Sequence, residues 1–189
     1  MDLRSDTELM MLVSEGDESA FAEIYRRYNR RLVNFFYALT RDCHASEDLS
    51  HETFARIWHY RRRYAATGSF ASYVFAFARF IWLERRRELA KLWKLGTLEP
   101  FDGSGEGLPS DPSQRPDECA ARSEMDEFLW QALEQLPDDQ RTVFVMRILQ
   151  RMSLEDIASA MNCPVNTVRS RKLLALKKLR TLLKRAVAS

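Results

Sequence analysis

Residues 152–180 read MSLEDIASAMNCPVNTVRSRKLLALKKLR, and this stretch decides the fold of the C-terminal part of the chain. Ser153 followed by Asp156 forms an S-x-x-D pattern, which is a capping signal for a helix that begins at Leu154. Asn162 tolerates the left-handed backbone conformation that ends many helices. The pattern therefore predicts a short helix followed at once by a tight turn.

A second helix follows the turn. Pro164 suits its start, Val165 and Val168 are expected to face inward, and Ala158 is small enough for the two helices to cross closely. This arrangement is typical of a helix-turn-helix, in which Arg reads guanine in the major groove and Lys binds phosphates. An ordinary helical hairpin with a solvated face is the alternative. The candidate DNA-binding residues are Asn166, Thr167, Arg169, Ser170, Arg171 and Lys172.

The chain divides into two parts around a linker. Residues 96–122 contain four of the six glycines and four of the six prolines, and they carry six acidic but only two basic residues. Such a stretch neither holds a helix nor buries enough apolar surface to pack. We expect an all-α protein with two small helical domains, 1–95 and 123–189, joined by an acidic flexible linker.

Hydrophobic spacing predicts helices throughout both domains. In the first domain we expect Asp6–Glu15, then Ala20–Thr40 after the break at Gly16, then a helix from a Ser46 cap. A fourth helix is expected to follow a Ser69 cap and to run from Phe70 to about Lys94. In the second domain, Pro137-Asp138 is expected to end one helix and begin the next.

Several function classes find little support. His51-Glu52 begins like a zinc-protease motif, but Ala55 stands where the second His is required. Cys43, His44 and His51 lack four-ligand spacing, so no metal, cofactor or enzymatic activity is expected. No apolar run approaches the length of a membrane span, and the first residues lack a signal-peptide pattern. The sequence predicts a soluble cytoplasmic protein.

Three segments resemble the sigma factors of bacterial RNA polymerase. Residues 45–64, ASEDLSHETFARIWHYRRRY, resemble region 2 of those proteins, and residues 68–87, GSFASYVFAFARFIWLERRR, resemble the segment that follows. Residues 133–171, which open with LEQLPDDQR, are similar to region 4. Two such blocks without a domain between them resemble the extracytoplasmic-function type. The resemblance implies an alternative sigma factor that directs promoter-specific transcription initiation.

The resemblance implies a polymerase-binding surface on the third helix, facing the coiled coil of the β′ subunit. Asp48 and Glu52 are four residues apart and share one helix face, which suits a basic partner. A solvated acidic face is the alternative reading. Apolar neighbours are expected to anchor either the core or the contact: Leu49, Phe54, Ile57 and Trp58.

The segment that follows is expected, by resemblance, to melt the −10 element and hold an unpaired base. Unpaired bases need stacking surfaces and cations. Candidate residues of both kinds are Tyr60, Arg61, Arg62, Arg63, Tyr64, Phe70, Tyr73 and Arg79, whereas Phe75, Phe77 and Trp82 are expected in the core.

By the same resemblance, the second domain is expected to read the −35 element and to meet the β flap of the polymerase. The acidic linker is expected to pass through the polymerase channel toward the RNA exit. An anti-sigma factor is expected to hold the protein inactive. Departures from the family pattern are Phe80 in place of Asn, Leu174 and Leu176 in place of Arg, and Asn166 in place of Gly. The promoter sequence therefore does not follow from relatives.

Two other classes compete with this interpretation. A helix-turn-helix activator or repressor that acts without replacing the sigma subunit should bind duplex DNA alone, as a dimer. An interaction protein without DNA binding should tolerate charge reversal at Arg169 and Arg171.

Overall fold

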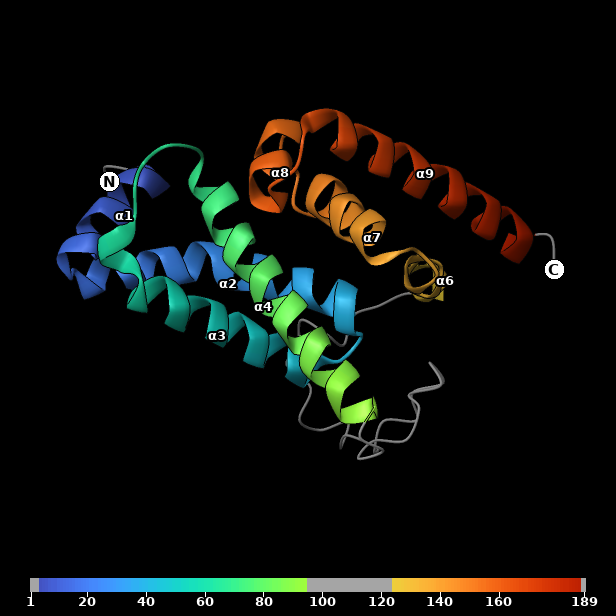
Figure 1. The fold of residues 1–189 in the computed structure, drawn as a ribbon, viewed down its shortest axis with the longest axis horizontal. Coiled ribbons are helices and arrows are strands. Elements are labelled where there is room, and N and C mark those ends of the chain that lie inside the picture. The colour runs from blue at the N-terminus through green and yellow to red at the C-terminus, as the bar shows by residue number, and fades with distance from the viewer. Residues whose placement is uncertain (1–3, 95–123, 188–189) are drawn as a thin grey trace.

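The computed structural model describes residues 4–94 and 124–187, and the predicted linker 96–122 lies outside the described residues. Every element in the described ranges is helical (Figure 1). The first region contains α1 (Asp6–Glu15), α2 (Glu18–Thr40), α3 (Cys43–His59), the short 3₁₀ turn η1 (Arg61–Arg63) and α4 (Phe70–Lys94). The second contains α6 (Glu124–Glu134), α7 (Asp138–Phe144), η3 (Val145–Leu149), α8 (Leu154–Met161) and α9 (Val165–Val187). The predicted all-α class is confirmed.

Local caps explain most helix ends. Gly16 has φ of +103° and ends α1, as its lack of a Cβ allows, and Asp17 then caps α2. The predicted Ser46 cap of α3 is corrected: Asp42 is the cap, and its carboxylate accepts from the Ala45 backbone at 3.1 Å. Ser46 is instead buried inside the first turn, where its hydroxyl bonds back to the Asp42 carbonyl.

The helix-turn-helix forms as its sequence predicts. The Ser153 hydroxyl accepts from the Asp156 backbone N–H at 2.9 Å, and Asn162 adopts the left-handed conformation with φ of 48°. Ala158 and Val168 are buried where α8 and α9 pack together. The turn is thus determined by residues that lie within it.

The two helical regions pack against each other. α4 lies between α3 on one side and α8 on the other (Figure 1). One buried apolar cluster runs continuously through this contact, from Phe75 and Ile81 in α4 to Ile157 and Met161 in α8. Burial of such side chains stabilises a fold by about 1.5–3 kcal/mol each. The hydrophobic effect therefore stabilises the packing of the second region on the first.

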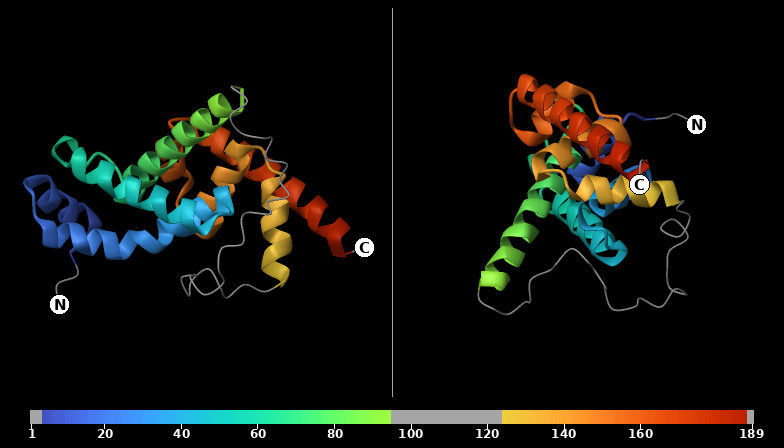
Figure 2. Two further views of the ribbon diagram at one scale, coloured as in Figure 1. Left: turned by 90° about the horizontal axis from the view of Figure 1, so that it is seen from below. Right: turned by 90° about the vertical axis from the view of Figure 1, so that its right-hand side faces the viewer.

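A second, smaller cluster lies at the far end of the molecule. Leu133 of α6 packs there with Ala175 and Leu179 of α9. The C-terminal end of α9 extends away from α1–α4 (Figure 2). The N-terminal end of α9 thus lies close to the first region, whereas the later turns of α9 pack against α6.

Candidate nucleic-acid and polymerase interfaces

A row of aromatic rings runs from the end of α3 to the first half of α4, and we call it the aromatic row: Tyr60, Phe77, Tyr73 and Tyr64. The rings of Tyr60 and Phe77 stack with centroids 6.2 Å apart. Tyr73 then meets Phe77 at 5.0 Å and Tyr64 at 4.9 Å, edge to face in both pairs. Burial raises the pKa of Tyr73 to about 12, so its hydroxyl is uncharged near neutral pH. All four rings keep part of their surface exposed, as a base-stacking platform requires.

Arginines of η1 border the aromatic row. The guanidinium of Arg63 lies 5.4 Å from the centre of the Tyr60 ring, and that of Arg61 lies 4.2 Å from the Trp58 ring. Arg62 is exposed beside them. This juxtaposition of cations and half-exposed rings is the combination that binds single-stranded nucleic acid.

Two predicted members do not belong to this surface. The Phe70 ring is only 3% exposed and packs edge to face against Tyr28 at 5.1 Å, so it is a core residue. Arg79 points to the second helical region, where its Nη2 lies 3.8 Å from a carboxylate oxygen of Asp139. Phe77, expected in the core, is partly buried against it and also contacts Tyr60 and Tyr73 in the row. α4 thus has three faces: one toward the core, one toward the second region and one in the aromatic row. The sequence pattern did not separate them, because each carries aromatic or basic residues.

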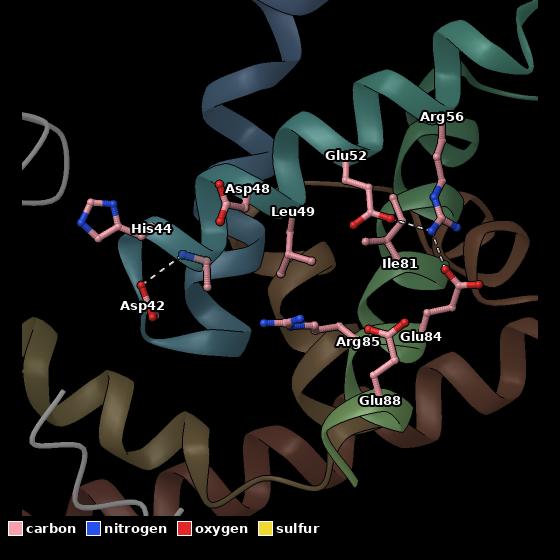
Figure 3. Close-up of a pocket in the computed structure, with 11 residues that line it drawn as sticks. Asp42, His44, Asp48, Leu49, Glu52, Arg56, Ile81, Glu84, Arg85 and Glu88 are labelled. Carbon is pink, nitrogen blue, oxygen red and sulfur yellow. Dashed lines mark hydrogen bonds and ion pairs between the residues drawn. The ribbon is translucent and has the colours of Figure 1, made fainter. Parts of the chain in front are cut away.

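An acidic groove lies between α3 and α4 (Figure 3). Its cavity measures about 360 Å³, and Arg56 bridges Glu52 at 2.5 Å and Glu84 at 2.6 Å across it. Asp48 and Glu88 also line the groove (Figure 3). The carboxylates exceed the cations, so the groove favours a basic partner.

The predicted polymerase-binding residues of α3 separate into two groups. Asp48 and Glu52 are exposed at the groove, and Leu49 lies beneath them with 5% exposure. Phe54 and Ile57 are buried in the core. They therefore position the helix from within the core. Of the two roles expected for them, core anchor or polymerase contact, their burial favours the first.

Trp58 lies apart from that groove. It is half-buried, its ring is 5.0 Å from that of Phe21, and it supports Arg61. Trp58 therefore holds Arg61 of η1 and does not line the acidic groove.

The first two turns of α9 present a polar stripe to solvent. Asn166, Arg169 and Ser170 are exposed, and Arg169 donates to the Asn166 side-chain oxygen at 3.3 Å. Thr167 and Lys172 flank the stripe and are partly buried. This stripe has the polarity expected of a helix that enters the major groove.

Arg171 is turned away from the stripe. Its Nη2 donates to the Asp139 carboxylate, and its Nη1 lies 3.8 Å from the Cys163 sulfur. In this arrangement Arg171 faces α7, in contrast to the direct base contact that its sequence position predicted.

Comparisons with known proteins decide the family. Residues 24–92 match the family model "Sigma-70 region 2", and residues 128–179 match "Sigma-70, region 4". The chain is 26% identical over 170 residues to RNA polymerase sigma-H factor of Pseudomonas aeruginosa, with 88% of this chain and 87% of the relative covered. It is 26% identical over 162 residues to ECF RNA polymerase sigma factor SigW of Bacillus subtilis, with coverage of 84% and 86%. The chain belongs to the extracytoplasmic-function sigma factors.

Two solved structures share the fold. CnrH, determined in complex with the cytosolic domain of CnrY, is 18% identical with a TM-score of 0.69, covering 96% of this chain and 99% of that one. RpoE from Bartonella quintana, in complex with the anti-sigma factor NepR, is 21% identical with a TM-score of 0.69, covering 87% and 96%. The chain is thus an alternative sigma factor that directs transcription initiation.

Sequence reasoning missed several polar residues of this sigma factor. Asp139 and Asp156 each join the two helical regions, and Ser72 of α4 donates to Asp156. Arg141 donates hydrogen bonds to backbone carbonyls at the C-terminal ends of two helices, to Leu39 O of α2 at 3.3 Å and to Glu134 O of α6 at 3.1 Å. The S-x-x-D pattern indicated Asp156 as a cap residue, but no local pattern indicates a contact between regions.

Two further observations on the described residues concern metal-ligand clusters and membrane-spanning helices. Among the described residues, no group of three or more His, Cys, Asp or Glu side chains is arranged to hold a metal ion. None of the helices in the described ranges has the length and apolar character needed to cross a bilayer.

Proposed function

We propose that this sigma factor divides initiation among three surfaces: the acidic groove binds core polymerase, the aromatic row opens the −10 element, and the exposed stripe of α9 reads the −35 element. One observation carries the proposal. A single chain combines a surface suited to unpaired bases with a helix suited to duplex DNA, on two packed regions.

The role of the aromatic row follows from its chemistry. Base stacking on an aromatic side chain contributes about 1–3 kcal/mol per base, and the arginines of η1 lie where they would hold the phosphates. Tyr60, 38% exposed, is the most accessible ring that the row presents. Phe80 does not take part, because its ring lies against Arg56 on the groove side of α4.

The role of the α9 stripe rests on its donors and acceptors. Arg169 offers paired N–H donors to a guanine edge, while Asn166 and Ser170 hydrogen-bond to other base edges or to phosphates. The lysines further along α9 supply a sequence-independent, salt-sensitive attraction to the DNA backbone.

The acidic groove suits a basic helical element of the polymerase core. Asp48 and Glu88 line it and form no ion pair within 4.0 Å in the described part of the chain, so their charge is available to a partner. The proposed contact is the coiled coil of the β′ subunit, and the second region is proposed to meet the β flap.

An anti-sigma factor is a further proposed partner. Both solved structures of this fold contain a bound protein, and the protein bound to the sigma factor RpoE is named an anti-sigma factor. The same proposal includes a cytoplasmic location, where polymerase acts, and the absence of enzymatic activity.

Run-off transcription with purified core polymerase tests the proposal. Transcript start mapping after overexpression identifies a promoter, and the purified protein with core should then transcribe from it. Failure to bind core at micromolar concentration would refute the proposal. A helix-turn-helix activator would instead bind the duplex alone and require another sigma factor.

A further inference from the structure

An exposed leucine directly follows the polar stripe of α9. Leu173 is 63% exposed and follows Ser170 by three residues and Arg169 by four, so all three share one face of the helix. Arg169 and Ser170, one turn earlier on this face, are polar, whereas Leu176, one turn later, is apolar and 41% exposed. A side chain of this size adds nothing to the core when it is so exposed. Its position at the start of the third turn of α9 places it directly after the residues with which a recognition helix meets the groove.

We propose that Leu173 contacts the C5-methyl group of a thymine in the −35 duplex. The major groove presents one apolar group, the thymine methyl, and an aliphatic side chain distinguishes it by excluding water from both. This inference deepens the proposed −35 function, on which it rests. It assigns part of the promoter specificity to Leu173, in a chain that has Leu174 and Leu176 where the family pattern has arginine.

Uracil substitution tests the contact, because uracil lacks only the methyl group of thymine. In a promoter fragment obtained by start mapping, each −35 thymine is replaced singly by uracil, and holoenzyme binding is measured. Burial of one methyl group predicts about a fourfold loss of affinity at one position. The loss should vanish in Leu173→Ala and persist in Leu176→Ala, an exposed leucine one turn further along.

The possible outcomes separate this inference from the function on which it rests. Binding that is insensitive to uracil at every position, or equally sensitive in Leu173→Ala, would overturn the leucine contact while leaving −35 recognition intact. Loss of core binding in Leu173→Ala would also overturn it, because the leucine would then serve a protein partner. Absence of any holoenzyme binding to the duplex would instead refute the proposed function.

A separate observation concerns Asp139 at the start of α7. Its carboxylate accepts from Arg171 of α9, and its other oxygen lies 3.8 Å from Nη2 of Arg79 in α4. The arginine side chains are largely covered, at 27% and 23% exposure, whereas the carboxylate is 44% exposed. One acidic group therefore holds one arginine from each helical region.

We infer that Asp139 competes with DNA phosphate for these two arginines. A carboxylate and a phosphate accept from the same guanidinium donors, so one arginine group cannot fully serve both. While Asp139 holds Arg171 and Arg79, it favours the packed arrangement of the two regions and withholds both cations from DNA.

The Asp139→Asn variant tests this inference without polymerase. Binding of the free chain to a short, fluorescein-labelled, random-sequence duplex is followed by anisotropy at low salt. Release of a partly exposed ion pair predicts about two- to fivefold tighter binding. Glu155→Gln, which changes the net charge equally at an exposed position of α8, is the matched control and should give less than half of that gain.

Two further measurements test whether the gain in DNA binding depends on Arg171 and on the packing of the two regions. The gain should disappear when Arg171→Gln is combined with Asp139→Asn, and the radius of gyration from small-angle scattering should increase in Asp139→Asn alone. Equal gains in Asp139→Asn and Glu155→Gln, or a gain that survives Arg171→Gln, would overturn the inference. These readouts do not depend on core binding, so they stand apart from the test of the sigma function.

Discussion

Asp156 of α8 accepts a hydrogen bond from the hydroxyl of Ser72 in α4, at 3.0 Å, across the contact between the two helical regions. Ser69, the N-cap of α4, donates to the same carboxylate oxygen at 2.5 Å. The other oxygen accepts from Ser153, the cap of α8, at 2.7 Å. One carboxylate thus stabilises the starts of two helices at once, where the helix dipoles favour negative charge.

The first prediction follows from that position. Asp156→Ala should lower the free energy of unfolding by about 2–3 kcal/mol, because it removes several hydrogen bonds to a charged group and leaves the Ser72 hydroxyl buried without this acceptor. Urea denaturation monitored by circular dichroism measures the change. Glu155→Ala, one residue earlier and exposed, should change stability by less than about 0.5 kcal/mol. Equal effects would contradict the assigned role.

The pH dependence of stability gives a second prediction. Burial of the Asp156 carboxyl acts to raise its pKa, but hydrogen bonds from Ser69, Ser153 and Ser72 outweigh it and hold the pKa below the ordinary 3.8. Because the folded-state pKa is lowered, the stabilisation is complete above that ordinary value and is lost as the pH falls through the folded value. The stability difference between wild type and Asp156→Asn should therefore be constant from about pH 7 to pH 5 and shrink below about pH 4. A difference that grows on acidification would refute this assignment.

Arg141 supports a third prediction. Its side chain is only 13% exposed, and burial lowers the pKa of its guanidinium, against the opposing effect of Asp138. Arg141→Met should cost about 2 kcal/mol in unfolding free energy, because the Leu39 and Glu134 carbonyls lose their donor. The matched control is Arg180→Met, at an exposed position of α9, which should be nearly neutral.

The aromatic row gives a fourth prediction. Tyr60→Ala should reduce promoter opening by holoenzyme about tenfold, because one base loses its stacking surface. Permanganate reactivity of unpaired thymines at the −10 element measures opening. Phe80→Ala also removes an exposed ring from the same region but on the groove side, so at saturating core it should open the promoter normally. Normal opening by Tyr60→Ala would remove this residue from the proposed surface.

The acidic groove gives a fifth prediction. Glu52→Lys should weaken core binding at least about tenfold, because it reverses a groove charge and breaks the Arg56 bridge. Glu15→Lys makes the same charge change at the exposed end of α1 and should leave core binding unchanged. Fluorescence anisotropy of labelled sigma factor with core polymerase measures both. Equal weakening would indicate a nonspecific effect of charge.

Much of the fold was predictable because its signals are local. Helix limits at Gly16, Pro137 and Asn162 depend on backbone preferences of the residues themselves, and α1, α4 and α8 have the bounds that the sequence predicts. The start of α3 was misplaced because Asp42 and Ser46 are both good caps, and only packing buries Ser46. The candidate sites were harder, because faces of α4 carry similar residues for different purposes.

The sequence by itself determined the helical class, the helix-turn-helix and the family resemblance, since each rests on residue types at short, fixed spacings. Only the tertiary structure decided which partners those residues have. Ser72 and Asp156 are 84 positions apart, and Arg79 and Arg171 meet Asp139 from different regions. Such contacts depend on how the apolar faces of α4 and α8 pack, and a long-range packing geometry has no local signature in the chain.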